Sequence, residues 1–393
     1  MTLDSLPAVL IWVSTGTVVW VYAGYPVTLA LLGLLFGRPR RRAPITPSVA
    51  VVVAAHDEEE RIGAKIANIR ASRYPRDRLE VVVASDGSGD RTAHEARRAG
   101  ADAVIELPRV GKLSAINAAV ERSAGEILVF TDADSTLEPE SVASLVSSFA
   151  DPDVGAATAN VVRVGSDGVA GGEGLYWRYD QWIKRLEDRL GSAVSADGNL
   201  YAVRRELFEP SGVTDGTDDF VISTQVIRAG RRLAFEDRAR VLVERPGDGR
   251  AEFRRKVRVM NRGMRAAFSL GSNLLPWNGG WYSVEVVSHK LLRRLVPLFL
   301  LAVLASSAWL AAARGGAWWA VLLLQLGFYV LAGVGAIGRD RPWGRARILA
   351  VPFYFCLVNA AAGAAVLSLL RGTRFRVWQP ERDAVQPRRH LWT

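Results

Sequence analysis

Long apolar segments at the two ends of the chain limit its possible folds more than any other feature. Residues 9–36 contain no charged side chain, and this length exceeds the ~20 residues that a helix needs to cross a bilayer. Three further apolar segments cover 295–313, 317–337 and 348–370. They predict a multi-pass membrane protein, with one transmembrane helix within 1–37 and three within 295–370. A cleaved signal peptide is the alternative for the first segment, which is long for one and has no basic region before it.

Basic residues gather next to these apolar segments. The chain carries a net charge of +10, and the run Arg38-Pro39-Arg40-Arg41-Arg42 directly follows the first segment. By the positive-inside rule, this run predicts that the middle of the chain lies in the cytosol, at the cell membrane. The placement of the charge favours the lipid bilayer as its partner and argues against nucleic acid. Aromatic and basic residues mix at 271–294, which predicts an amphipathic helix at the membrane interface.

The basic tail at 371–393 conflicts with a simple count of crossings. Its six arginines predict a cytosolic end, whereas three crossings after a cytosolic domain would place the tail outside. We expect that one of the three segments does not cross fully, with 348–370 as the best candidate, unless the tail is basic for another reason.

Cysteine and histidine usage excludes some classes of protein. The single cysteine, Cys356, lies in an apolar segment. The chain therefore cannot build an internal disulfide framework or a cysteine-based zinc site. The four histidines are scattered and show no metal-ligand spacing.

The middle of the chain, 48–270, alternates between strand and helix signals. Short apolar runs rich in β-branched residues predict strands, at 48–55, 79–84, 103–107 and 126–131. Polar, helix-forming stretches separate them, at 58–70, 90–99 and 112–123. Such alternation predicts an α/β domain with a parallel sheet and helices on both faces. Ligands of such sheets bind beyond the carboxyl ends of the strands, so functional residues are expected there.

Polar residues follow all four predicted strands. The clusters are His56-Asp57-Glu58-Glu59, Ser85-Asp86-Gly87-Ser88, Gly111-Lys112 and Asp132-Ala133-Asp134. A single carboxylate after a strand is often only the N-cap of the next helix. Four polar clusters along one edge of a sheet are hard to explain by capping alone, and they favour a functional cleft.

Asp132 and Asp134 are the strongest candidates for metal ligands. In an extended segment, side chains two residues apart point to the same side, and two carboxylates held together repel each other unless a cation neutralises them. Hard oxygen ligands suit Mg²⁺ or Mn²⁺, which would also hold the phosphates of a nucleotide donor. The alternative is a loop that caps a helix beginning near Glu138.

Together these motifs resemble glycosyltransferase family 2. The resemblance rests on Asp57-Glu58-Glu59, Ser85-Asp86-Gly87-Ser88, Lys112-x-x-Ala115-x-Asn117, Asp132-Ala133-Asp134 and Thr217-Asp218-Asp219. Arg255-x-x-Arg258-Val259 takes the place of the Gln-x-x-Arg-Trp motif of polysaccharide synthases. The resemblance covers about 48–270, and it is closest to the membrane-bound synthases of cellulose, hyaluronan and poly-N-acetylglucosamine. It implies a GT-A-type nucleotide-sugar-binding domain with a mixed, mostly parallel sheet.

The resemblance also implies a role for each matching residue. The residues that would bind a nucleotide-sugar donor, such as a UDP-sugar, are Asp57, Glu59, Asp86, Lys112, Asp132 and Arg258. The metal ion would be held by Asp132 and Asp134. Asp219 would be the catalytic base of an inverting transfer, taking the proton from the acceptor hydroxyl.

Three residues are weaker candidates for contacting the acceptor. Asp218 adjoins the base, and Asn199 lies in a small-residue loop that the family places near the acceptor, although a plain turn before a strand explains that loop equally well. Trp177 could stack on a sugar, but an aromatic residue on an amphipathic helix near a membrane more often belongs to the core or the interface. The Gln and Trp of the family's last motif are Arg255 and Val259 here, which leaves the acceptor open.

The sequence favours transfer of a sugar to a glycan acceptor at the membrane, with or without export of a polymer. The altered motif at 255–259 adds weight to an alternative, transfer to polyprenyl phosphate or another lipid. A non-catalytic nucleotide-binding membrane protein and a nucleotidyltransferase are two other classes. Intact Asp132, Asp134 and Asp219 argue against the first, and a basic motif beside the membrane argues against the second.

Overall fold

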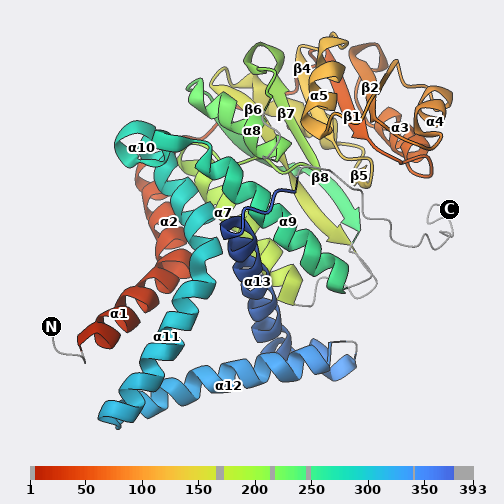
Figure 1. Ribbon diagram of the computed structural model, residues 1–393. Helices are drawn as coiled ribbons and strands as arrows, with labels where there is room; N and C mark the ends of the chain where they lie inside the picture. The colour runs from red at the N-terminus through yellow and green to blue at the C-terminus, as the bar shows by residue number, and fades with distance from the viewer. Residues whose placement is uncertain (1–4, 165–171, 213–216, 245–248, 340, 376–393) are drawn as a thin grey trace.

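The computed structural model describes residues 5–164, 172–212, 217–244, 249–339 and 341–375. Figure 1 shows two parts, an α/β domain built on one sheet and a group of long helices that extends away from it. The expected basic tail falls largely outside the described residues, because only 371–375 of it are included.

One eight-stranded sheet forms the centre of the α/β domain, in the order β3-β2-β1-β4-β7-β6-β8-β5. Its strands are β1 (Val49–Ala55), β2 (Leu79–Asp86), β3 (Ala103–Leu107), β4 (Ile127–Thr131), β5 (Ser135–Leu137), β6 (Val154–Val164), β7 (Leu200–Arg204) and β8 (Arg232–Glu244). The first four strands are mutually parallel, and so are β6 and β8. By contrast, β7 runs antiparallel to β4 and β6, and β5 runs antiparallel to β8. The predicted α/β fold with a mixed, mostly parallel sheet is therefore confirmed.

The central strand β1 is apolar throughout because helices cover both faces of the sheet. All seven residues of β1 are buried, and they alternate between two hydrophobic clusters, one on each face. The first cluster includes residues of α3 (Ile62–Arg70), α4 (Thr92–Arg98) and α6 (Ser141–Ser147). The second includes residues of α5 (Lys112–Glu121) and α8 (Asp218–Arg228).

The helix predicted from residue 58 begins only at Ile62, because residues 58–61 form a turn. The helix expected near Glu138 begins at Ser141, after the short strand β5. Both differences move the first helical turn away from the carboxyl ends of β1 and β4, and they leave room there for loops.

Within the described residues, four helical segments are long and apolar enough to cross a membrane: Leu6–Phe36, Pro276–Arg314, Ala317–Ile337 and Arg347–Leu370. The first comprises α1 (Ser5–Val19), a π-helical turn (Trp20–Gly24) and α2 (Tyr25–Phe36). The second comprises α10 (Pro276–Glu285), a π-helical turn (Val286–Leu292) and α11 (Arg293–Arg314). The third and fourth are α12 (Ala317–Ile337) and α13 (Arg347–Leu370). Two amphipathic helices, α7 (Gly172–Leu190) and α9 (Gly249–Phe268), lie between the sheet and these segments.

The helix α13 returns to the α/β domain. Near its end, the Ser368 hydroxyl accepts a hydrogen bond from the Asn261 amide of α9 at 2.7 Å, and the Thr373 carbonyl accepts one from Arg265 at 2.8 Å. Figure 1 shows α12 running across the ends of α11 and α13 that lie away from the sheet. The segment that runs crosswise is therefore α12, whereas the sequence analysis had singled out 348–370 as the segment that does not cross fully. With this path, residue 370 lies on the same side as the α/β domain.

Candidate active site at the carboxyl ends of the strands

Lys112 lies at the centre of the site, between two carboxylates from distant parts of the chain. Its ammonium Nζ is 2.7 Å from Asp132 Oδ1 and 3.1 Å from Asp218 Oδ1. Lys112 begins α5, Asp132 follows β4, and Asp218 begins α8. Burial alone would lower the pKa of Lys112, but the charges of the two aspartates raise it. The lysine is therefore a fixed cation that joins the predicted donor-binding residues to the helix carrying the predicted base.

Asp132 and Asp134 lie in a turn between β4 and β5 and not in an extended segment, as the two-residue spacing had suggested. The turn forms because the Asp132 carbonyl accepts a hydrogen bond from the Ser135 hydroxyl at 3.0 Å. The Asp134 side chain is exposed, whereas Asp132 is half-buried. Their charges still act on each other, so the two carboxylates remain close although the reason expected for it was wrong.

A second lysine, Lys65 of α3, stabilises this turn by hydrogen bonds. Its buried ammonium donates to the Thr131 hydroxyl at 2.8 Å and to the Ser135 carbonyl and hydroxyl at 2.7 and 3.0 Å. Thr131 in turn donates to the carbonyl of Asn199 at 2.8 Å. Lys65 thus fixes the backbone before and after Asp132.

The carboxylates of Asp132, Asp134 and Glu58 lie close to this turn, and the cations nearby do not fully neutralise them. Burial raises the pKa of Asp132 to about 6, with Lys112 opposing the rise and Asp134 and Asp218 adding to it. Burial also raises the pKa of Glu58 to about 7, and the charges of Asp134 and Asp132 contribute. The charges of Asp132 and Asp134 raise the pKa of Lys65, although burial outweighs them and lowers it to about 7. The site therefore has an unmet demand for positive charge.

This demand fits a divalent cation. Asp132 and Asp134 offer oxygen ligands, which Mg²⁺ and Mn²⁺ prefer. Among the described residues, no group of three or more His, Cys, Asp or Glu side chains could hold a metal ion. The protein would thus supply two carboxylates, and the remaining ligand positions would be left for phosphate oxygens and water.

Three of the predicted donor-binding residues, Asp57, Glu59 and Asp86, lie in or beside loops that bind each other. Asp57 accepts a hydrogen bond from the Gly89 amide at 2.8 Å, and Glu59 accepts one from the Arg91 amide at 3.0 Å. Asp86 is buried and accepts hydrogen bonds from the Val110 and Gly111 amides at 2.7 and 3.0 Å. These carboxylates therefore shape the loops beyond β1, β2 and β3.

Asp57 also has an unusual backbone. Its φ is 53°, and no other non-glycine residue among those described has a positive φ. Aspartate tolerates this left-handed conformation better than most residues, and such conformations cluster at functional sites. No pattern in the sequence predicted this conformation.

Asp219 lies one residue beyond Asp218, at the start of α8, beside the loop that precedes β7. A Cβ placed on Gly198 would lie 3.8 Å from its carboxylate carbon and Oδ2. Asn199, next along that loop, donates to the Asp197 carboxylate at 2.6 Å. The small residue at 198 leaves the Asp219 carboxylate room on this side, as an acceptor site would require.

Burial, and then the charge of Asp218, raise the pKa of Asp219. The charge of Lys112 favours the ionised form, but it does not outweigh these two effects. A raised pKa makes a carboxylate a stronger proton acceptor and suits a general base that works near neutral pH.

Two predicted residues lie on the amphipathic helices α7 and α9. The Trp177 indole packs on the hydrophobic core and donates to the Val161 carbonyl at 2.5 Å. Arg258 lies on α9, half-buried.

The sequence analysis missed Lys65 and Glu58. Lys65 lies on the buried face of α3, together with Ile62, Ile66 and Ile69. A lysine on an otherwise apolar helix face was a signal that could have been followed.

Three comparisons with known proteins bear on this site. Residues 50–210 match a family described as Glycosyl transferase family 2. An N-acetylglucosaminyltransferase of Sinorhizobium fredii is 26% identical over 325 residues, 74% of each chain. A beta-monoglucosyldiacylglycerol synthase of Trichormus variabilis is 27% identical over 206 residues, 48% of this chain and 44% of its own.

A solved structure shares the fold. It is the mannosyltransferase PcManGT from Pyrobaculum calidifontis, in complex with GDP-Man and Mn²⁺. It is 24% identical, with a TM-score of 0.68 over 93% of this chain and 100% of that chain. The match extends beyond the α/β domain into the apolar helices, since it covers nearly the whole chain.

Proposed function

We propose a function from one premise, that the match of residues 50–210 to glycosyl transferase family 2 reflects the activity of that family. The chain is an inverting glycosyltransferase that moves a hexose from a nucleotide sugar, a UDP-sugar in the first instance, to an acceptor hydroxyl at the membrane. Mannosyl, glucosyl and N-acetylglucosaminyl transfer are the activities named for its relatives and fold neighbour. The observation that carries the proposal is Lys112, whose ammonium joins Asp132 to Asp218 beside Asp219.

The reaction is a single displacement at C1 of the donor sugar. Asp219 takes the proton of the acceptor hydroxyl, whose oxygen forms a bond to C1 on the face opposite the leaving group. The bond from C1 to the phosphate oxygen breaks, and the nucleoside diphosphate leaves with both electrons. Lys112, and Arg258 if α9 approaches the donor, would stabilise charge on the leaving group.

Asp132 and Asp134 would hold a divalent cation, as the site's unmet demand for positive charge supports. The bound ion would supply positive charge to the donor diphosphate. Lys65 keeps the turn in place while the donor enters and leaves, because its ammonium holds the residues on both sides of Asp132.

The test uses the full-length protein in detergent with a panel of radiolabelled UDP-sugars and GDP-mannose. We expect Mn²⁺-dependent release of nucleoside diphosphate with at least one donor, and loss of this activity in Asp134→Asn. Glu140→Gln is the matched control, because Glu140 is an exposed carboxylate paired with Arg73 on the surface. Full activity in excess chelator would remove the metal from the mechanism.

We also propose that the α/β domain lies in the cytosol and that residue 370 lies on the same side. The Arg38–Arg42 run and the contacts of α13 with α9 support both statements. Protease treatment of inside-out and right-side-out vesicles should cut the α/β domain and a C-terminal tag from the same side. Cleavage of the two from opposite sides would contradict the proposal.

A further inference from the structure

Positively charged side chains gather on the membrane side of Asp219. They are Lys184 of α7, Lys290 of the π-helical turn, and Arg293 and Arg294 at the start of α11. We call them the membrane-side cation cluster. The charge of Asp219 acts on Lys184, Lys290 and Arg294. The neighbouring Phe220 packs in one hydrophobic cluster with Val286 and Leu291, so the start of α8 and the π-helical turn are in contact.

Arg293 is held in place by groups of the domain. Its guanidinium donates to Asp180 at 2.7 Å and lies 4.6 Å from the ring centre of Tyr176. The acidic side chains of Asp180 and Glu187, which lie nearby, have partners as well. Asp180 also faces His289 at 3.2 Å, and Glu187 is 2.7 Å from both Tyr25 and His289. Glu285 is buried in the same region.

Lys290 and Arg294 differ from Arg293, because nothing in the described part of the chain neutralises them directly. Nη1 of Arg294 is buried without a hydrogen-bond partner there, and Lys290 makes no hydrogen bond or ion pair with the described residues. The two cations are four residues apart and repel each other, which is unfavourable on one helix face. Lys184 adds a third charge, which Asp197 at 3.8 Å and the charge of Asp180 partly neutralise. An anion between them would relieve this repulsion.

Gly263 of α9 provides the space in which Arg294 lies. A Cβ at this position would be 2.6 Å from Arg294 Nη2. The guanidinium is therefore directed against the backbone of α9, and not toward open solvent.

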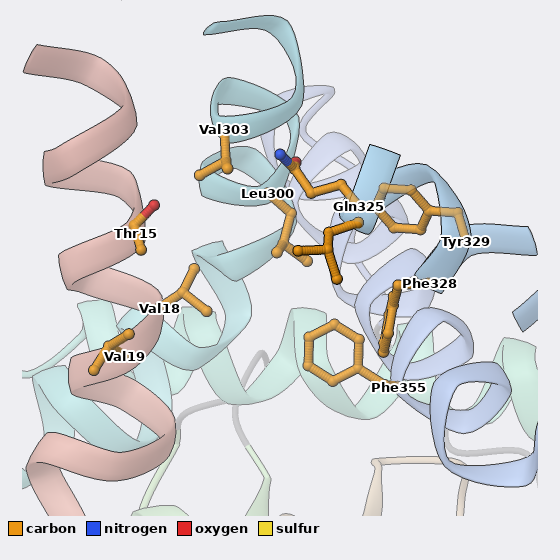
Figure 2. Close-up of a pocket in the computed structure, with 10 residues that line it drawn as sticks. Thr15, Val18, Val19, Leu300, Val303, Gln325, Phe328, Tyr329 and Phe355 are labelled. Atoms are coloured by element: carbon orange, nitrogen blue, oxygen red, sulfur yellow. The ribbon is translucent and has the colours of Figure 1, made fainter. Parts of the chain in front are cut away.

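An apolar groove of about 360 Å³ lies further along α11. Figure 2 shows side chains of α1, α11, α12 and α13 around it, among them Val18, Leu300, Phe328 and Phe355. Leu300 is seven residues after Arg293, about two turns along the same face of α11. The Phe355 ring is 5.5 Å from that of Tyr22. The groove and the cation cluster thus lie along the same helix, α11.

We propose that the acceptor is a lipid whose hydroxyl-bearing headgroup is joined to its hydrocarbon through phosphate. Lys290 and Arg294, with Lys184, bind the phosphate, the headgroup hydroxyl reaches Asp219, and the hydrocarbon lies in the groove. This inference rests on the proposed function and names its acceptor class. The transfer itself is unchanged: the headgroup oxygen bonds to C1, its proton goes to Asp219, and the nucleoside diphosphate leaves.

The test measures binding of radiolabelled farnesyl phosphate and farnesol to the full-length protein in nonionic detergent. The two probes differ only in the phosphate. We expect farnesyl phosphate to bind at least tenfold more tightly, and Lys290→Met or Arg294→Met to reduce this preference. Lys290→Arg, which keeps the charge, should retain most of it. Arg314→Met is the matched control, because Arg314 ends α11 away from the cluster, and it should leave the preference unchanged.

Equal binding of the two probes by the unaltered protein would overturn the inference, whatever the variants do. A preference that persists in the Lys290→Met, Arg294→Met double variant would also overturn it. Mn²⁺-dependent UDP binding, measured in the same preparation, tests the proposed function separately. If UDP binds and farnesyl phosphate is not preferred, the acceptor class is wrong and the glycosyltransferase stands.

Discussion

The site has a donor side, at the loops beyond β1, β2 and β4, and a membrane side, around α7 and the π-helical turn Val286–Leu292. The two sides hold their charged side chains in different ways. On the donor side, Asp57 and Asp86 accept hydrogen bonds from backbone amides of neighbouring loops. On the membrane side, Asp180 is bound by the side chains of His289 and Arg293, more than a hundred residues away in the sequence. The first arrangement depends on loops at strand ends, and the second on how helices pack against the domain.

The difference shows which part of the site is fixed by the sheet. Parallel strands bring their carboxyl ends together whatever the membrane helices do. The membrane-side cations instead depend on the π-helical turn Val286–Leu292, which carries His289 and Lys290 inward. We therefore expect donor chemistry to be robust and acceptor selection to be sensitive to helix packing.

The largest expected effect comes from Asp219, which lies where the two sides meet. Asp219→Asn keeps the shape of the side chain but cannot take a proton, so kcat should fall about 10²–10⁴-fold. The donor KM should change little, because Lys112, Asp132 and Asp218 remain. Steady-state kinetics with the active donor would measure both.

Asp237→Asn is the control for this change, since Asp237 is a half-exposed carboxylate on the surface. If Asp219→Asn keeps near-normal turnover, the aspartate only stabilises the start of α8. The base would then be sought at Asp218, which Lys112 contacts at 3.1 Å.

The second largest effect is expected from substituting His289, on the membrane side of the site. His289→Leu removes the partner of both Glu187 and Asp180 and leaves Glu187 fully buried. Breaking such a buried charged network costs about 3–5 kcal/mol. We expect a markedly lower melting temperature in detergent. His94→Leu, on the exposed face of α4, is the matched control, and equal melting temperatures for the two variants would show that the network contributes little.

The sequence predicted the donor side much better than the membrane side. Apolar runs and the carboxylates after them located β1, β2 and β4 and the cluster at Asp132, because both signals are local. The pairing of Lys112 with Asp218 could not be predicted from the residues alone, since it depends on how α8 packs against α5. The return of α13 to α9 likewise follows from contacts such as that of Asn261 with Ser368, which no periodicity reveals.

The motif spacing also predicted the right neighbours for a wrong reason at Asp132 and Asp134. An extended strand was expected, and the structure has a turn stabilised by Ser135 and Lys65. Sequence patterns indicate which side chains meet more reliably than they indicate the local backbone that brings them together.

The third largest effect is the pH dependence of Mn²⁺ binding on the donor side of the site. Burial raises the pKa of Asp132 to about 6, so this carboxyl group holds its proton up to a higher pH than usual. Below pH 6 the protonated form cannot bind a cation, and Mn²⁺ affinity should fall about tenfold per pH unit. Calorimetric titration with Mn²⁺ from pH 5 to 8 would measure this. Affinity that stays constant down to pH 5 would contradict a role for Asp132 as a ligand.

The smallest effect tests whether Trp177 belongs to the acceptor site or to the core. Trp177→Phe keeps an aromatic ring against the core but loses the hydrogen bond to the Val161 carbonyl. A hydrogen bond of this kind contributes about 1 kcal/mol, so a small drop in melting temperature is expected, with an acceptor KM within about twofold of normal. Trp182→Phe, on the same helix and more exposed, is the control. A large rise in acceptor KM for Trp177→Phe without loss of stability would instead place the indole at the acceptor. The membrane side would then select its acceptor by stacking as well as by charge.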